Sequence, residues 1–288
     1  MAASMDYVNV PVDPVCQPIR VLPEKAIDSH FHIFESQSRY PFTPDRSFTP
    51  VESTWSQYKQ LMQSAGFRRG VLVHPSVYGF DLSSFKDLLI AHPEQLRGVC
   101  VIKPNTIESE IEQLHSLGVR GVRINIIYAG GSQLEDAKRL ADLIKPFGWH
   151  LQFLVDVSLK PDTPVWASKL GVSVVFDHFG HPSNFDIADP GFQNLCACVK
   201  EGVGWAKLSG AYRFAKTATH AHSVQRHVDA LLNVNVNSLV WGSDWPHTQI
   251  IAPIPNDGEL VDDLYQWLPD PQLREQVLIA NAERLYDF

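Results

Sequence analysis

The sequence predicts an α/β protein of a single domain, an eight-stranded (β/α)8 TIM barrel. Three observations predict this fold. Eight short apolar runs recur along the 288 residues, and amphipathic stretches with helical spacing lie between them. The length also suits such a barrel, which takes roughly 250 residues. Strands that alternate with helices form a parallel sheet, and eight strands close into this barrel.

The eight predicted strands are short, apolar and regularly spaced. They are 26–34 (AIDSHFHIF), 69–76 (RGVLVHPS), 97–104 (RGVCVIKP), 119–127 (VRGVRINII), 150–155 (HLQFLV), 171–178 (GVSVVFDH), 202–210 (GVGWAKLSG) and 238–246 (SLVWGSDWP). We expect residues 26–288 to form the barrel domain. Residues 1–25, rich in Pro and Val, are predicted to form an arm on its outside, and 248–288 a closing helical segment.

Helices are predicted where apolar residues recur every three or four positions. TWSQYKQLMQSAG places Trp55, Tyr58 and Leu61 on one face. TIESEIEQLHSLG and QLEDAKRLADLIKPFG end at Gly118 and Gly148, and glycine is a common stop at the carboxyl end of a helix. FQNLCACVKEG and HSVQRHVDALLN fill the last two gaps between strands.

Composition excludes several classes of function. The net charge is −8 without long blocks of like charge, which argues against a nucleic-acid or anionic-membrane surface. No apolar run approaches the roughly 20 residues of a membrane span, and the amino terminus lacks the pattern of a signal peptide. The four cysteines have no framework spacing. We therefore expect a reduced, cytoplasmic enzyme, and a homo-oligomer is compatible with the sequence.

Polar residues gather at the predicted carboxyl ends of the strands, where the active site of such a barrel lies. His30 and His32 are two apart, so they share one face of a strand. Taken alone, this pair is equally compatible with hydrogen-bonded core histidines. Burying many polar groups costs several kcal/mol unless they pair, bind or react. The set that favours an active site is His30, His32, His74, Ser76, Arg123, Asn125, His178, Lys207, Ser209, Tyr212, Arg213 and Asp244.

Three motifs carry a resemblance to a known family. DSHFHIF, FDHFGHP and GSDWPHT follow one another on the predicted strands one, six and eight. In this the chain resembles the amidohydrolase superfamily, and within it the lactone hydrolases typified by 2-pyrone-4,6-dicarboxylate lactonase. The resemblance implies a carboxylic-ester hydrolase acting on an anionic lactone. It assigns the chemistry to His30, His32, His178 and Asp244.

The resemblance also implies a set of substrate-binding residues. Arg123 and Arg213 match arginines that hold substrate carboxylates, and Ser76 falls in a pocket segment. The lactonase has further arginines where this chain has Ala129 and His181. Because two bidentate carboxylate partners are lost, the same dicarboxylate is an unexpected substrate. The candidate substrate-binding residues are Arg123, Arg213, Ser76, Tyr78, Tyr128, Gln152, His181 and His247.

The mechanism expected from these residues is water attack on the ester carbonyl. Asp244 would act as general base and return the proton to the leaving oxygen. The three histidines would polarise the carbonyl, and the two arginines would anchor a carboxylate. A metal ligand set of His30, His32, His178 and Asp244 would suit one Zn²⁺. The lactonase branch is thought to work without metal, so we expect none, with one zinc ion as the alternative.

Three alternatives remain open. A metal-dependent decarboxylase of the same superfamily would release CO₂, but such enzymes tend to have an early glutamate, and Glu35 faces away from the histidine pair by strand parity. A lactone isomerase would use the same site with a substrate hydroxyl in place of water. A non-catalytic binding protein would normally lack the aspartate or a histidine. The sequence alone does not identify the substrate.

Overall fold

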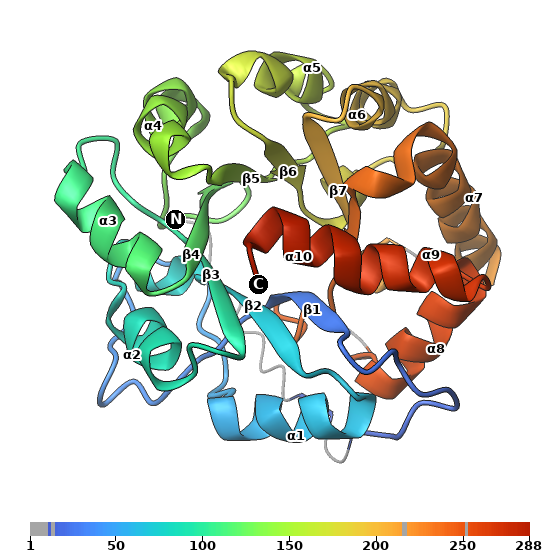
Figure 1. Ribbon diagram of the computed structural model, residues 1–288, viewed down its shortest axis with the longest axis horizontal. Helices are drawn as coiled ribbons and strands as arrows, with labels where there is room; N and C mark the ends of the chain where they lie inside the picture. The colour runs from blue at the N-terminus through green and yellow to red at the C-terminus, as the bar shows by residue number, and fades with distance from the viewer. Residues whose placement is uncertain (1–10, 13–14, 215–217, 251–252) are drawn as a thin grey trace.

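Eight parallel strands form one sheet in chain order, with the helices around its outside (Figure 1). The computed structural model describes the chain except for residues 1–10, 13–14, 215–217 and 251–252. The strands are β1 (Ile27–Phe31), β2 (Arg69–Val73), β3 (Leu96–Cys100), β4 (Val119–Asn125), β5 (His150–Leu154), β6 (Val174–Phe176), β7 (Gly204–Leu208) and β8 (Leu239–Trp241). The predicted fold class is confirmed.

The helices surround the barrel, and the last one lies across one end of it (Figure 1). They are α1 (Trp55–Ala65), α2 (Ser83–Ala91), α3 (Glu108–Ser116), α4 (Ala137–Ile144), α5 (Thr163–Ala167), α6 (Pro190–Lys200), α7 (Ala218–Asn235), α8 (Asp257–Trp267), α9 (Pro271–Glu275) and α10 (Asn281–Tyr286). Tyr286 of α10 packs with inward-facing Val175 and Val240. Arg97 at the start of β3 donates to the carbonyl of Asp287. The amino ends of the strands are therefore covered, and the carboxyl ends form the mouth.

The predicted elements match the observed ones, with differences at the ends. Thr54 and Gln57 form a capping box at the start of α1, and Gly66 ends the helix with a φ of 95°. The sequence patterns did not single out α2 and α5. The predicted strands 171–178 and 238–246 were too long, because the chain leaves the sheet after Phe176 and Trp241.

The amino-terminal segment lies partly outside the described residues, namely at 1–10 and 13–14 of the predicted arm 1–25. Where it is described, it runs against α8. The backbone N–H of Cys16 donates to Asn256, and that of Ile19 donates to Asp262. The hydroxyl of Tyr265 donates to the carbonyl of Val21.

The contact between β1 and the chain after β8 closes the barrel and sets the site. The backbone N–H of Asp244 donates to the carbonyl of His30, and that of His32 to the carbonyl of Trp245, both at 2.8 Å. β1 also contains a bulge, because Asp28 pairs with Gly70 whereas Phe31 pairs with Leu72. The extra residue reverses strand parity. It turns both histidines into the barrel, whose inner face begins with Ile27.

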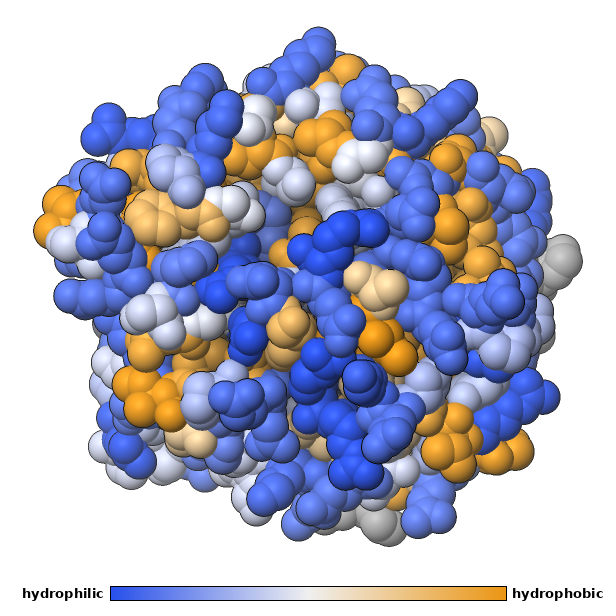
Figure 2. All heavy atoms as spheres, in the orientation of Figure 1, coloured by the Kyte–Doolittle hydropathy of each residue, from blue (hydrophilic) through white to orange (hydrophobic). Residues whose placement is uncertain are grey.

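The face that carries α10 is mainly hydrophilic, with hydrophobic atoms in separate groups (Figure 2). In the described part of the chain, no helix has the length and apolar character needed to cross a bilayer. The apolar residues instead fill the layer between strands and helices, where Phe31 stacks on Tyr58 with ring centroids 3.7 Å apart.

Candidate active site

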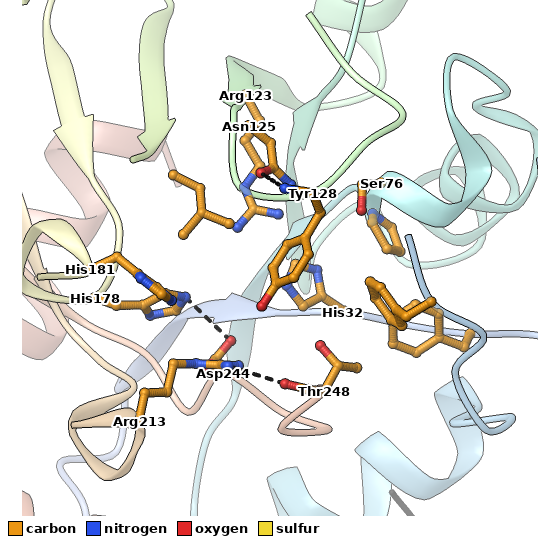
Figure 3. Close-up of a pocket in the computed structure, with 14 residues that line it drawn as sticks. His32, Ser76, Arg123, Asn125, Tyr128, His178, His181, Arg213, Asp244 and Thr248 are labelled. Carbon is orange, nitrogen blue, oxygen red and sulfur yellow. Dashed lines mark hydrogen bonds and ion pairs between the residues drawn. The ribbon is translucent and has the colours of Figure 1, made fainter. Parts of the chain in front are cut away.

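A narrow cavity opens at the carboxyl ends of the strands (Figure 3). The sequence-predicted residues that line it are His32, Ser76, Arg123, Asn125, Tyr128, His178, His181, Arg213 and Asp244. Residues that sequence reasoning did not assign to the site also line it, including the aromatic rings of Phe34 and Phe48 and the side chain of Thr248.

Two predicted site residues lie deeper in the barrel than expected. Gln152 is fully buried and donates to Asp177, whereas Leu154, two residues later on β5, lines the cavity. Both face inward, but two strand residues span about 6.6 Å, so Gln152 lies one layer below. His30 is also fully buried and lies behind His32, outside the cavity lining. Parity predicts the face of a strand but not the depth of a residue.

Two more predicted residues face other neighbours. The ring of Tyr78 packs against Phe42, with ring centroids 5.1 Å apart, and is outside the cavity lining. His247 is buried, with Nδ1 2.9 Å from the hydroxyl of Tyr212 and Nε2 3.2 Å from Oδ1 of Asp257. Direct contact of either side chain with a ligand in this cavity is therefore not supported by their positions.

The two oxygens of Asp244 have different surroundings. Oδ2 accepts hydrogen bonds from the hydroxyl of Tyr212 at 2.6 Å and from Nε of Arg213 at 2.8 Å, and Nη2 of Arg213 lies at 2.7 Å. Oδ1 faces Nε2 of His178 at 3.6 Å and Nε2 of His30 at 3.8 Å. Burial alone would raise the pKa of Asp244, but Arg213 and the histidines hold it well below its usual value. Sequence reasoning missed this role of Tyr212, although it precedes Arg213.

The histidines at the cavity are neutral and held by fixed partners. Nδ1 of His32 lies 2.7 Å from the carbonyl of Val73, and Nδ1 of His178 lies 2.8 Å from the hydroxyl of Ser209. Burial holds the pKa of both histidines well below its usual value. At neutral pH each ring therefore has one N–H donor and one acceptor nitrogen.

Three cavity residues have left-handed backbone conformations. The φ angles are 52° at His178, 49° at His181 and 63° at Asp244. Such conformations are costly for residues other than glycine and occur preferentially at functional sites. The surrounding hydrogen bonds hold these residues where strand geometry would not place them.

Beneath the cavity, Asp177 pairs with two cations. Its Oδ2 accepts from Nε of Arg123 at 3.2 Å and from Nη2 at 3.0 Å, and Nζ of Lys207 lies 3.5 Å from Oδ1. Burial lowers the pKa of Lys207 to about 8, although Asp177 acts in the opposite direction. Nη1 of Arg123 has no hydrogen-bond partner among the described residues. Sequence reasoning missed Asp177, even though it directly precedes His178 in a motif.

Residues 27–288 match the family described as Amidohydrolase. The chain belongs to the amidohydrolase family. The chain is similar to a curated 4-sulfomuconolactone hydrolase from Hydrogenophaga intermedia, with 29% identity over 98% of both chains. Another similar protein is a 2-pyrone-4,6-dicarboxylate hydrolase from Comamonas testosteroni, 28% identical over 92% of this chain and 91% of its own. The recognition of the family from its three motifs is confirmed.

Solved structures show the same fold. The apo structure of ATU3138 from Agrobacterium tumefaciens has a TM-score of 0.85 and 24% identity, and the match covers 94% of this chain and 98% of that one. An amidohydrolase from Burkholderia multivorans with bound zinc has a TM-score of 0.69 and 18% identity, with 92% and 99% covered.

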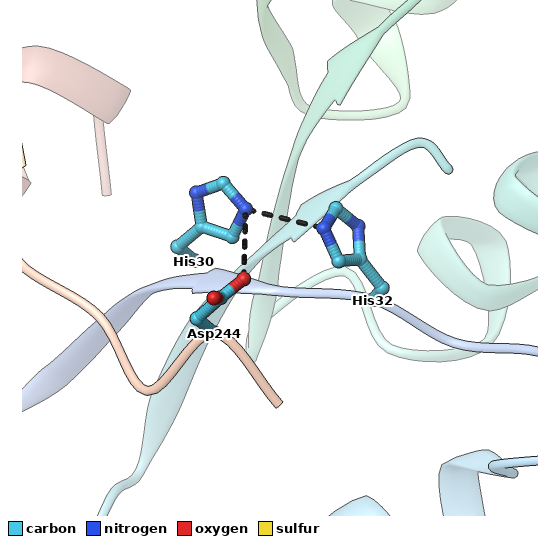
Figure 4. Close-up of side chains that lie close together, drawn as sticks. All are labelled: His30, His32 and Asp244. Atoms are coloured by element: carbon cyan, nitrogen blue, oxygen red, sulfur yellow. Dashed lines mark hydrogen bonds and ion pairs between the residues drawn. The ribbon is translucent and has the colours of Figure 1, made fainter. Parts of the chain in front are cut away.

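One cluster of side chains at the cavity has the composition of a metal site. Among the described residues, His30, His32 and Asp244 offer ligand atoms within 4.8 Å of one another (Figure 4). These separations suit one cation. The hydrogen-bond partners fit only in part, because metal-binding histidines usually donate their other N–H to an oxygen. Nδ1 of His32 lies 2.7 Å from the carbonyl of Val73, whereas Nδ1 of His30 lies 3.2 Å from the ammonium of Lys207 and 3.2 Å from Oδ1 of Asp177.

The buried histidines predict that stability is lost in acid. Burial lowers the pKa of His30, His74 and His181 to about 4, whereas such groups titrate near 6.5 in an unfolded chain. Between these values the unfolded chain binds protons that the folded chain does not, so stability falls as the pH falls. Asp28 has the opposite effect on stability, since burial raises its pKa to about 6. This one group offsets the effect of only one of the three histidines. The urea concentration at which half of the protein is unfolded should therefore decrease when the pH is lowered from about 7 to about 4.5. A constant or rising midpoint would contradict these shifts.

Proposed function

We propose that the protein hydrolyses a carboxylate-bearing lactone. The observation that carries this is the asymmetry of Asp244, whose Oδ2 is held by Tyr212 and Arg213 while Oδ1 is open beside His178. A carboxylate fixed through one oxygen presents the other to a water molecule in a defined direction. Two curated relatives with names of lactone hydrolases support the same reaction.

The proposed mechanism begins with water attack on the ester carbonyl. Asp244 Oδ1 takes a proton from the attacking water as the new C–O bond forms, and the ester C–O bond then breaks. The proton passes from Asp244 to the leaving oxygen, so the product is a hydroxy acid with one water added. His178 lines the cavity beside Asp244 and polarises the carbonyl. His32 also lines the cavity, but its Nδ1–H is directed at the carbonyl of Val73, so His32 and the buried His30 act by positioning the groups around Asp244.

The substrate carboxylate is assigned to Arg123. Two of its nitrogens hold Asp177, and Nη1 is open toward the cavity. Arg213 uses Nε and Nη2 on Asp244 and Nη1 on the carbonyl of Thr248, so its first role is to hold the base. The proposal includes Ser76, Tyr128 and His181 as polar contacts for the rest of the ligand.

Replacing Arg123 with lysine should raise KM for a carboxylate lactone by about 10-fold or more, because a charge-assisted hydrogen bond contributes about 1.5–3 kcal/mol. kcat should change much less, because Asp244 is not touched. The measurement is steady-state kinetics with each substrate. The control is a lactone of similar size without a carboxylate, whose KM should not change. An equal rise in KM for both lactones would refute the anchoring role.

We also propose that the reaction needs no bound metal, on the grounds of the hydrogen bond between Lys207 and His30. Elemental analysis of protein purified without chelator should find less than stoichiometric zinc, and treatment with a chelator should leave kcat unchanged. Stoichiometric zinc whose removal abolishes turnover, and whose return restores it, would contradict this.

The experiment that tests the function is a substrate panel. Lactones with one carboxylate, with two carboxylates and with sugar rings should be compared, with and without added Zn²⁺ or Mn²⁺. Ring opening of a carboxylate lactone without added metal is the expected result. The decarboxylase alternative has little support here, because Glu35 accepts a hydrogen bond from the backbone of Trp55 at 3.0 Å and lies outside the cavity lining. No turnover of any lactone in the panel would contradict the proposal.

A further inference from the structure

Lys207 is a buried cation without a role in the proposed reaction. β7 carries it inside the barrel, where its side chain is fully buried. Its ammonium donates to the carbonyl of Ser29 at 3.0 Å and to Oε1 of Gln152 at 2.8 Å. A further N–H faces Nδ1 of His30 at 3.2 Å. An ammonium has no acceptor, so Lys207 can only donate.

The hydrogen bond of His32, at the other end of the histidine pair, also has a fixed direction. The carbonyl of Val73 can only accept, so Nδ1 of His32, 2.7 Å away, has its proton there. In a neutral ring Nε2 is then an acceptor. Nε2 of His30 lies 3.2 Å from this nitrogen and must donate to it. Nδ1 of His30 is therefore bare, and it accepts from Lys207. The hydrogen bonds of Lys207 and of Val73 thus imply the same tautomer of His30.

The opposite tautomer of His30 creates two conflicts. Its Nδ1–H could point to Oδ1 of Asp177, which lies 3.2 Å away. Two lone pairs would then face each other between His30 and His32, and the N–H of Lys207 would face another N–H. The first assignment has one cost, because it leaves the buried Oδ1 of Asp177 without a hydrogen-bond partner among the described residues, 3.5 Å from the ammonium of Lys207.

We infer that Lys207 is a positioning residue that holds His30 in the tautomer with its proton on Nε2. The hydrogen bonds run in one direction, from Lys207 through His30 and His32 to Val73. Because the proton of His30 is given to His32, Oδ1 of Asp244 receives no hydrogen bond from His30, at 3.8 Å. That oxygen remains available to the attacking water. This consequence for catalysis rests on the proposed function, whereas the tautomer does not.

The same series of hydrogen bonds disfavours a metal ion between His30 and His32. A cation bound between the two Nε2 atoms needs a bare Nε2 on His30 and a proton on Nδ1, where Lys207 already donates. Zinc bound through His30 and this chain of hydrogen bonds therefore exclude each other.

Nuclear magnetic resonance of the wild-type protein tests the tautomer without a substrate. The chain is labelled with ¹⁵N-histidine, and the signals of His30 are identified by their loss in His30→Gln. Long-range ¹H–¹⁵N spectra should show Nε2 protonated and Nδ1 bare, also after addition of ZnCl₂. A proton on Nδ1, or loss of the Nε2 proton with stoichiometric zinc binding, would overturn the inference. The proposed function would survive that result.

Kinetics of two variants test the role of Lys207. Lys207→Met removes the donor, so the proton of His30 should move to Nδ1 and kcat should fall by about 10²-fold or more. KM should stay nearly constant, because the residues that line the cavity are unchanged. Lys207→Gln keeps an N–H donor and should restore the tautomer and most of kcat. Lys200→Met, at the exposed end of α6, is the matched control. A folded Lys207→Met protein with unchanged kcat or tautomer would refute the role.

Discussion

Replacing Asp244 with asparagine should lower kcat for lactone hydrolysis by about 10³-fold, which is within the range for loss of a general base. Asparagine is nearly isosteric, and its carbonyl oxygen can still accept from Tyr212 and Arg213. It cannot take a proton from water. The expected result is therefore a folded protein that binds the lactone with nearly unchanged affinity and hardly turns it over.

The matched control is Asp189→Asn. Asp189 is a buried aspartate that accepts from the backbone N–H groups at the start of α6, and asparagine caps helices equally well. Its kcat should stay at the wild-type value. Circular dichroism and a urea titration show whether each variant folds. Near wild-type turnover by a folded Asp244→Asn protein would rule out Asp244 as the base.

Replacing Asp177 with asparagine should lower the free energy of unfolding by about 3–5 kcal/mol, the usual effect of breaking a buried ion pair. Asp177 and Lys207 are fully buried, and Arg123 is almost so. Removal of the one carboxylate leaves two buried cations without their shared counter-charge. The urea midpoint measures the loss.

The control is Asp142→Asn on the exposed face of α4. Asp142 pairs with Lys138, and both side chains are more than half exposed, so the loss should stay below about 1 kcal/mol. The double variant Asp177→Asn with Lys207→Met removes a charge of each sign. It should be more stable than Asp177→Asn alone. Equal losses in the free energy of unfolding for Asp177→Asn and Asp142→Asn would show that the buried ion pairs contribute no more to stability than an exposed one.

The fold could be predicted because its signal is repeated. Eight apolar runs recur at regular spacing, and amphipathic stretches were recognised in most of the gaps between them, so the two helices that were missed, α2 and α5, did not change the strand count. The ends of elements were less predictable. His178 and Asp244 lie beyond their strands, in left-handed conformations that only the assembled site stabilises.

The sequence predicted which site residues share a strand face, but not their depth in the barrel or their hydrogen-bond partners. Spacing placed His30 and His32 on one face, but only the bulge in β1 turns that face inward. Strand parity could not show that Gln152 lies one layer below the cavity. The partner of Arg123 was equally hidden, because Asp177 is 54 residues away in the chain. Such pairs depend on coordinates rather than on local pattern.

The most direct test of the central claim follows the fate of a carboxylate lactone in H₂¹⁸O by mass spectrometry. The proposed mechanism predicts a hydroxy acid that has gained one water, with one solvent oxygen in the carboxylate formed from the ester. The same label should be nearly absent when Asp244→Asn is used for the same time. A product with the mass of the substrate would indicate an isomerase, and release of CO₂ a decarboxylase. Either result would contradict water attack assisted by Asp244.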